Sequence, residues 1–234
     1  MEYRNLGNSG LKVSELSFGS WVTFVNQLGK KEAMDCMAYA YDQGVNFFDN
    51  AEAYAGGESE IIMGKGFKKL GLSRDSYIVS SKVFWGGEKP TQRGLSHKHI
   101  IDACHNAMKR LQVDYLDLYF CHRPDPETPI EETVRAMHTL VMQGKICYWG
   151  TSEWSLHELK SAYGIAKKFA DYLFVYIDAE DSQGNITFPH TMSLLKNKEP
   201  DYWPYWVFWN KGIEQKDSYL TWGKEVDDWI RKLE

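Results

Sequence analysis

Four side chains of the sequence suit proton transfer to a carbonyl oxygen, namely Asp49, Tyr54, Lys82 and His122. A carbonyl that receives a hydride needs a proton at its oxygen, and an unperturbed tyrosine, with a pKa of about 10, gives one up reluctantly. A nearby ammonium lowers the pKa of a phenol, and a carboxylate behind that ammonium holds it in place. We therefore interpret Tyr54 as a general acid, Lys82 as its electrostatic partner and Asp49 as the group that orients Lys82. His122 would hydrogen-bond the carbonyl and orient it.

The elements that must position these residues alternate regularly along the chain. Apolar patterns and turn residues predict a small hairpin over residues 1–12, strands over 13–21, 45–49, 75–83, 115–123, 145–152 and 172–178, and helices over 30–43, 59–70, 96–111, 129–144 and 155–169. Strict strand–helix alternation predicts a parallel sheet with right-handed crossovers. Asp49, Lys82 and His122 each stand at the C-terminal end of a predicted strand. In a parallel α/β barrel these ends form the active face, so the three side chains should converge.

Each of the four residues also has a purely structural explanation. A strand-end aspartate such as Asp49 often caps a turn, and Lys82 could be a solvated residue at the edge of the sheet. His122 could satisfy backbone groups, and a single tyrosine usually serves packing. Their register on successive strand ends favours the functional interpretation over these four separate ones.

Composition narrows the class of protein. The chain has 234 residues and a formal net charge of −5, which does not suit binding to nucleic acid or to an anionic membrane. The first residues lack the apolar segment of a secretory signal, and no apolar run approaches the roughly 20 residues that span a bilayer. The four cysteines show no C-x-x-C spacing, so neither a zinc site nor a disulfide framework is expected. We expect a reduced cytoplasmic protein without a metal site or membrane insertion.

Several strings of the sequence resemble a known family. They are YRNLGNSGLKVSELSFGSWVTF, GVNFFDNAEAYA, SKVFWGG, RGLSHKHI, CHRPDPETPIEETVRAM and YWGTSEWS, and they cover residues 1–169 almost continuously. With these strings the chain resembles the aldo-keto reductases, most closely the branch similar to voltage-gated potassium channel beta subunits. The resemblance implies a TIM barrel that uses NADPH and a tetrad that falls on the four residues named above.

The resemblance also implies binding residues and a function. Contacts to the cofactor or substrate would fall on Ser20, Trp21, Gln27 and Ser152, with Trp85 and Trp154 nearby. The implied activity is NADPH-dependent reduction of an aldehyde or ketone. Histidine at position 122 is similar to the soluble enzymes rather than to the animal channel subunits. A channel-like protein is the partner that the branch implies.

Residues 170–234 depart from this family pattern. The family's glutamine on strand six, its Trp-Ser-Pro-Leu string and its basic motif for the NADPH 2′-phosphate cannot be matched there. We expect a weak helix over 187–198, an aromatic strand over 202–209 and a helix over 221–233, which together form a shortened closing segment packed on the same barrel. The chain would then have two parts, residues 1–169 and 170–234, that arose either by natural loss or by recombination into a chimera, and NADPH binding would be weakened. Two alternatives remain open: a non-catalytic barrel scaffold that keeps the tetrad, and a channel-subunit-like interaction protein.

Overall fold

The fold is known from a computed structural model that describes residues 1–7, 9–21, 24–25, 28–169, 173–177 and 191–192. Its main sheet has seven strands in chain order: β3 (Ser17–Gly19), β4 (Phe47–Asp49), β5 (Ile78–Val83), β6 (Leu116–Cys121), β7 (Ile146–Ser152), β8 (Leu173–Ile177) and β9 (Thr191–Met192). β3 to β8 pair in parallel, and β9 is antiparallel to β8. The predicted α/β class with a parallel sheet is therefore confirmed.

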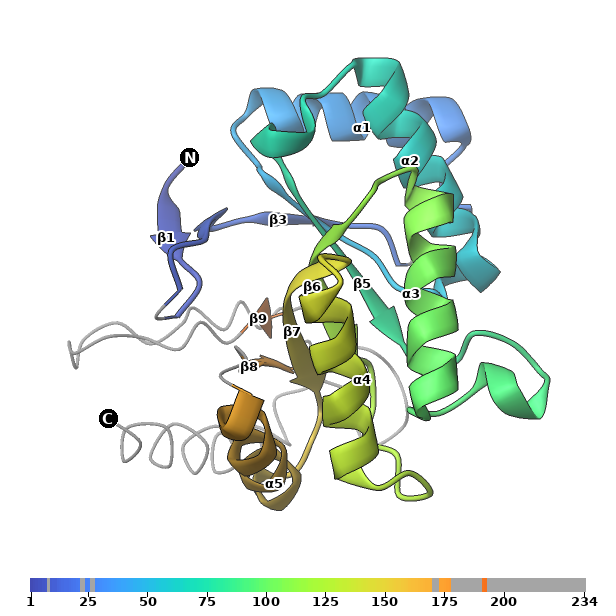
Figure 1. Cartoon of the computed structure of the whole chain (residues 1–234). Helices are drawn as coiled ribbons and strands as arrows, with labels where there is room; N and C mark the ends of the chain where they lie inside the picture. The colour runs from blue at the N-terminus through green and yellow to red at the C-terminus, as the bar shows by residue number, and fades with distance from the viewer. Residues whose placement is uncertain (8, 22–23, 26–27, 170–172, 178–190, 193–234) are drawn as a thin grey trace, which may run out of the picture.

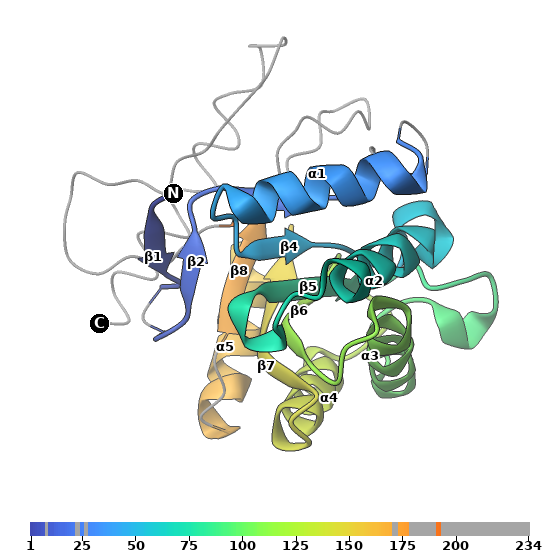
Figure 2. The ribbon, with the colours of Figure 1, turned by 90° about the horizontal axis from the view of Figure 1, so that it is seen from above.

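Among the described residues, five helices follow the strands in alternation and lie on the outside of the curved sheet (Figures 1 and 2). They are α1 (Lys30–Asp42), α2 (Glu58–Leu70), α3 (His97–Leu111), α4 (Ile130–Met142) and α5 (Leu156–Ala166). Each helix packs against the next one along the chain. The described residues therefore form the strand–helix units of a barrel wall, with the strand order running from β3 to β9.

Short 3-10 turns complete the connections between these elements. They are η1 (Tyr54–Gly57), η2 (Arg74–Ser76), η3 (Pro90–Gln92) and η4 (Lys167–Phe169). The predicted helix over 155–169 is thus an α-helix that ends at Ala166 and tightens into η4. Its start is a capping box, in which the Ser155 side chain accepts from the backbone N–H of Glu158 and the Glu158 side chain accepts from that of Ser155.

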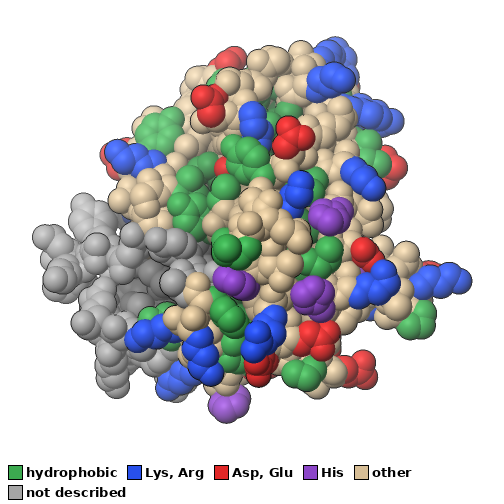
Figure 3. Space-filling view, in the orientation of Figure 1, with side chains coloured by type: hydrophobic (Ala, Val, Ile, Leu, Met, Phe, Trp, Pro, Cys, Tyr) green, Lys and Arg blue, Asp and Glu red, His purple; other side chains and the backbone are tan. Residues whose placement is uncertain are grey.

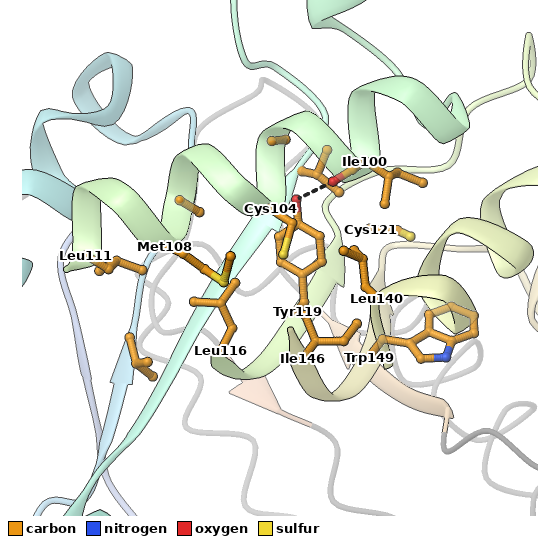
Figure 4. Close-up of a cluster of buried hydrophobic side chains, with 14 of the residues drawn as sticks. Ile100, Cys104, Met108, Leu111, Leu116, Tyr119, Cys121, Leu140, Ile146 and Trp149 are labelled. Carbon is orange, nitrogen blue, oxygen red and sulfur yellow. Dashed lines mark hydrogen bonds between the residues drawn. The ribbon is translucent and has the colours of Figure 1, made fainter. Parts of the chain in front are cut away.

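Neighbouring residues of the central strands enter two separate apolar layers. Phe47, Ile78 and Phe120 belong to an inner cluster. The residues that follow or precede them on the strands, Phe48, Val79 and Tyr119, belong to a larger cluster that faces the helices. Figure 4 shows part of this outer layer, where α3 packs on β6 and the Tyr119 hydroxyl donates to the Ile100 carbonyl at 3.5 Å. This alternation follows from the two-residue period of a strand. It also predicts that Asp49, two residues after Phe47, lies on the inner face.

An N-terminal hairpin covers one end of the inner cluster. β1 (Tyr3–Asn5) and β2 (Lys12–Ser14) pair antiparallel outside the main sheet, as the turn residues of this segment predicted. Leu6 and Val13 of the hairpin pack with Phe47 and Ile78, the first residues of β4 and β5. The hairpin therefore closes the N-terminal end of the strands, and the chemistry belongs to the opposite end.

Two predicted elements were wrong in part. The strand expected over 13–21 is divided, because Ser14 ends β2 and its hydroxyl donates to the Leu16 carbonyl at 2.6 Å, a local bond that interrupts the ladder before β3. Thr191–Met192, expected to be helical, is strand β9, whose backbone pairs with Tyr176 and Ile177 of β8. The strand over 202–209 and the helix over 221–233 lie outside the described residues. The division at residue 169 and the packing of the closing segment stay predictions.

Candidate active site

A buried lysine is the centre of the site. Lys82, near the end of β5, is 0% exposed, and its ammonium donates to Asp49 Oδ2 at 2.6 Å, to the Tyr54 hydroxyl at 3.0 Å and to the Asn50 carbonyl at 3.1 Å. An ammonium has three N–H donors, so these three contacts match its full capacity. A buried charge is tolerated when it is paired and hydrogen-bonded, and both conditions are met here.

The strands bring Asp49 and Lys82 together by register. Asp49 ends β4 and is 1% exposed, and Lys82 lies on the adjacent parallel strand with the same inward direction as Ile78. Ser80 lies between Ile78 and Lys82 on the same inward face of β5, and its hydroxyl donates to Asp49 Oδ1 at 2.5 Å. The two carboxylate oxygens thus hold different donors, which orients Asp49 toward the ammonium. The sequence predicted the ion pair but not the contribution of Ser80.

A tight turn returns Tyr54 to the end of β4. After Tyr54 the backbone is left-handed at Ala55 (φ 50°), Gly56 (φ 61°) and Gly57 (φ 91°), and α2 begins at the next residue. Left-handed backbone favours glycine, which explains the Gly56–Gly57 pair. A side chain at Gly57 would also meet Arg110, since a Cβ there would lie 2.9 Å from Arg110 Cδ. The turn leaves Tyr54 3% exposed beside the ammonium.

His122 and an aromatic wall complete the group. His122 directly follows β6, is 5% exposed, and its backbone N–H donates to the Val83 carbonyl at 3.0 Å. Its ring lies 5.9 Å from that of Tyr54 and 5.0 Å from that of Trp85, both approximately edge-on. Trp85 is 38% exposed, so it borders both His122 and solvent. The structure therefore brings the four predicted catalytic residues together at the C-terminal ends of three adjacent strands.

Three of the four residues expected to bind the cofactor, Ser20, Trp21 and Ser152, lie near this group. The Trp21 ring is 6.1 Å from that of Tyr54. Ser152 ends β7, is fully buried, and its hydroxyl lies 3.4 Å from Arg123 Nη1. Ser20 is also fully buried, and its hydroxyl donates to the Asp49 carbonyl at 3.1 Å while it accepts from Ser59 at 2.8 Å. Gln27 lies outside the described residues, and the binding roles of all four stay predictions.

Further features lie outside this group. Trp154 is 2% exposed, and Trp85 is the more accessible of the two expected neighbours. All four cysteines are unpaired thiols, and burial raises the pKa of Cys104 to about 12 and that of Cys121 further, which makes both thiols unreactive.

Within the described ranges, no cluster of three or more His, Cys, Asp or Glu residues could hold a metal ion, and no helix is long and apolar enough to cross a membrane. On the face shown in Figure 3, basic, acidic and apolar side chains are interspersed.

Comparison with known proteins gives concordant matches. The model of the Aldo/keto reductase family matches residues 15–182. Two curated proteins named "Probable voltage-gated potassium channel subunit beta", from Arabidopsis thaliana and Oryza sativa subsp. japonica, are 54% and 52% identical over 168 residues, which is 72% of this chain and 51% of each relative. The chain therefore spans about half the length of these relatives. A crystal structure of a thermostable aldo-keto reductase with the inhibitor epalrestat matches with a TM-score of 0.66 and 30% identity, over 76% of this chain and 63% of that one.

Proposed function

Because the chain belongs to the aldo/keto reductase family, we propose that it reduces an aldehyde or ketone with Tyr54 as the proton donor. The observation that carries this proposal is the sharing of one buried ammonium, on Lys82, between Asp49 and the Tyr54 hydroxyl. A structural ion pair would need only the carboxylate. A phenol placed on the same ammonium is the arrangement that a general acid requires.

The protein's own groups divide the chemistry as follows. Lys82 donates to the Tyr54 oxygen, so that oxygen accepts one hydrogen bond and directs its own hydrogen away from the ammonium. When the phenol gives up its proton to a carbonyl oxygen, the ammonium stabilises the negative charge that remains on Tyr54. Asp49 keeps the ammonium in place and balances its charge. His122 lies beside Tyr54 and would hydrogen-bond the same carbonyl oxygen and orient it.

The expected cofactor fits the chemistry of the neighbouring side chains. The Trp21 ring and the Ser152 hydroxyl offer an aromatic surface and a hydrogen-bonding group for a nicotinamide ring and its carboxamide. These two residues, with Ser20, would hold that end of NADPH. NADPH supplies the hydride when it is bound. The buried setting of Asp49, Tyr54 and Lys82 would exclude water from the proton transfer.

The experiment that tests this function is consumption of NADPH by the purified chain in the presence of a panel of aldehydes and ketones. The expected result is oxidation of NADPH that depends on the carbonyl compound and saturates with its concentration. Omission of the carbonyl compound is the control. Oxidation at the same rate with and without it, or none with any compound, would contradict the proposal.

A second candidate function is association with a channel protein. Its supporting observation is the identity of 54% and 52% to plant proteins named as probable potassium channel beta subunits. The proposed partner is the cytoplasmic domain of such a channel, and the proposed compartment is therefore the cytoplasm. Co-purification of the chain with an immobilised channel domain would support this function, and elution of the chain at the position of the unbound protein would contradict it.

A further inference from the structure

A second buried carboxylate, that of Glu52, lies between Asp49 and Tyr54 in the sequence. Glu52 is 5% exposed, three residues after Asp49 and two before Tyr54. Its backbone N–H donates to the Lys82 carbonyl at 3.2 Å, and its Oε1 accepts from the Phe84 N–H at 2.7 Å. Glu52 thus binds the backbone on both sides of Val83, the last residue of β5. The loop that carries Tyr54 is fastened by these bonds to the strand that carries Lys82.

The charge of Glu52 faces a buried histidine. His99 of α3 is 3% exposed, and its Nε2 lies 3.6 Å from Glu52 Oε1. Its Nδ1 lies 2.8 Å from the Gly94 carbonyl, which can only accept, so Nδ1 carries a hydrogen. With both nitrogens facing acceptors, the doubly protonated cation is the form that satisfies the ring. Burial alone would lower the pKa of His99, but the hydrogen bonding and charge of Glu52, together with the Gly94 carbonyl and the charge of Asp102, outweigh burial and raise it.

Two other carboxylates complete the surroundings of His99. Asp102 lies on the same helix and also acts to raise the pKa of His99. Asp125, on the loop after β6, interacts with the charge of His99, and its Oδ2 accepts from the Leu95 N–H at 2.7 Å. All three carboxylates favour the cation. His99 therefore joins the loops that follow β4, β5 and β6.

The loop after β5 is packed directly onto this pair. A Cβ at Gly86 would lie 2.6 Å from Glu52 Oε2 and 2.8 Å from His99 Nε2, so a side chain at that position would displace the pair. The preceding residue is Trp85, whose ring borders His122 at 5.0 Å. The pair therefore supports the aromatic wall of the site as well as the loop that bears Tyr54.

We propose that Glu52 is a positioning residue, held by His99, that sets the contact between the Tyr54 phenol and the Lys82 ammonium. The effect of this positioning on catalysis rests on the proposed reductase function, whereas its effect on the pKa of the Tyr54 phenol does not. The phenol–ammonium distance is 3.0 Å with the pair intact. An increase of about 1 Å, at an effective dielectric constant of about 20, corresponds to an upward shift of about one pH unit in the titration of the phenol.

The test is an NMR titration of the whole chain labelled with ¹³C at the tyrosine Cζ, with the Tyr54 signal assigned by its loss in Tyr54→Phe. Glu52→Gln keeps the size of the side chain and an acceptor for Phe84 but removes the charge. Removal of the Glu52 charge would by itself lower the pKa of a nearby phenol, so a rise in the Tyr54 midpoint, which we expect to reach about one pH unit, reports a loosened contact with Lys82. The midpoint of His99 should fall in a parallel histidine titration. Glu60→Gln is the matched control.

Glu60 suits the control because it is, like Glu52, a buried carboxylate, but it lies elsewhere in the fold. It is fully buried on α2 and is bound by Ser81, which faces the helices, and by Arg110. Its replacement should therefore lower the stability of the fold and leave both midpoints in place. A Tyr54 midpoint in Glu52→Gln that falls, or that rises by less than about 0.2 pH unit, would overturn the proposal. A rise in Glu60→Gln as large as that in Glu52→Gln would overturn it as well.

A second variant keeps the test decisive if Glu52→Gln does not fold. His99→Gln retains a side chain of similar reach but removes the imidazole ring that holds Glu52, and it should also raise the Tyr54 midpoint. If the wild-type chain is a reductase, kcat in His99→Gln should fall relative to wild type, most strongly at about pH 6, with KM little changed. A Tyr54 midpoint equal to that of wild type would overturn the proposal. Absence of reductase activity in the wild type would refute only the proposed function, since the NMR result stands by itself.

Discussion

Replacement of Lys82 by methionine should destabilise the fold by about 3–5 kcal/mol, the usual cost of removing one partner of a buried ion pair. Lys82 and Asp49 have side chains that are 0% and 1% exposed, so water cannot replace the lost ammonium. Methionine is of similar length, which keeps the cavity term small. Asp49 would retain its bond from Ser80 but lose its contact with the Lys82 ammonium, at 2.6 Å. The main cost is thus a buried carboxylate that has lost its ammonium partner.

The assay is urea unfolding of Lys82→Met, Asp49→Asn and the double variant. The double variant should lose clearly less than the sum of the two single losses, because it leaves no unpaired charge. Arg135→Met is the matched control: its ion pair with Glu131 joins side chains that are 57% and 58% exposed, and exposed pairs contribute about 0–1 kcal/mol. Additive losses in the double variant, or a loss in Lys82→Met no larger than in Arg135→Met, would refute the reasoning.

Three further predictions concern the caps, the buried histidine and the cofactor. Ser155→Ala should cost about 1 kcal/mol in urea unfolding, because it removes the capping box of α5, and an unchanged midpoint would contradict this. The pKa of His99 is raised in the folded protein, so its pair with Glu52 stabilises the fold fully below the ordinary pKa of 6.5, and this stabilisation is lost as the pH rises through the folded pKa. The free energy of unfolding should therefore fall over that pH window in wild type but not in His99→Gln. NADPH should bind this chain weakly and with little preference over NADH in a fluorescence titration, since the family's 2′-phosphate motif is unmatched in residues 170–234; low-micromolar, selective binding would contradict that expectation.

The site could be predicted because residue type and strand position carry most of the information. Asp49, Lys82 and His122 stand at the ends of apolar runs that can only be buried strands, and parallel pairing then brings them to one edge. Tyr54 followed from its short distance in sequence to Asp49. The boundaries of α1, α2 and α3 followed from their apolar periodicity and from the glycine or serine at their ends.

The supporting contacts could not be predicted in the same way. Ser80 was identifiable only in retrospect, from its inward direction two residues before Lys82. The pairing of Glu52 with His99 depends on how α3 packs beside the loop after β4, which the sequence spacing of 47 residues does not reveal. The break at Ser14 and the strand at Thr191–Met192 were missed because local bonds and tertiary pairing override the apolar pattern.

The most direct test of the central claim is the turnover of Tyr54→Phe compared with that of Tyr119→Phe. Tyr54 is 3% and Tyr119 1% exposed, so both variants remove one hydroxyl from a buried ring, but the Tyr119 hydroxyl contacts the Ile100 carbonyl in the outer layer. With NADPH and a carbonyl substrate, Tyr54→Phe should lose about 10²–10⁴-fold in kcat while its unfolding stays cooperative, and Tyr119→Phe should keep its rate. A rate in Tyr54→Phe within about twofold of wild type would contradict the assignment of Tyr54 as the general acid.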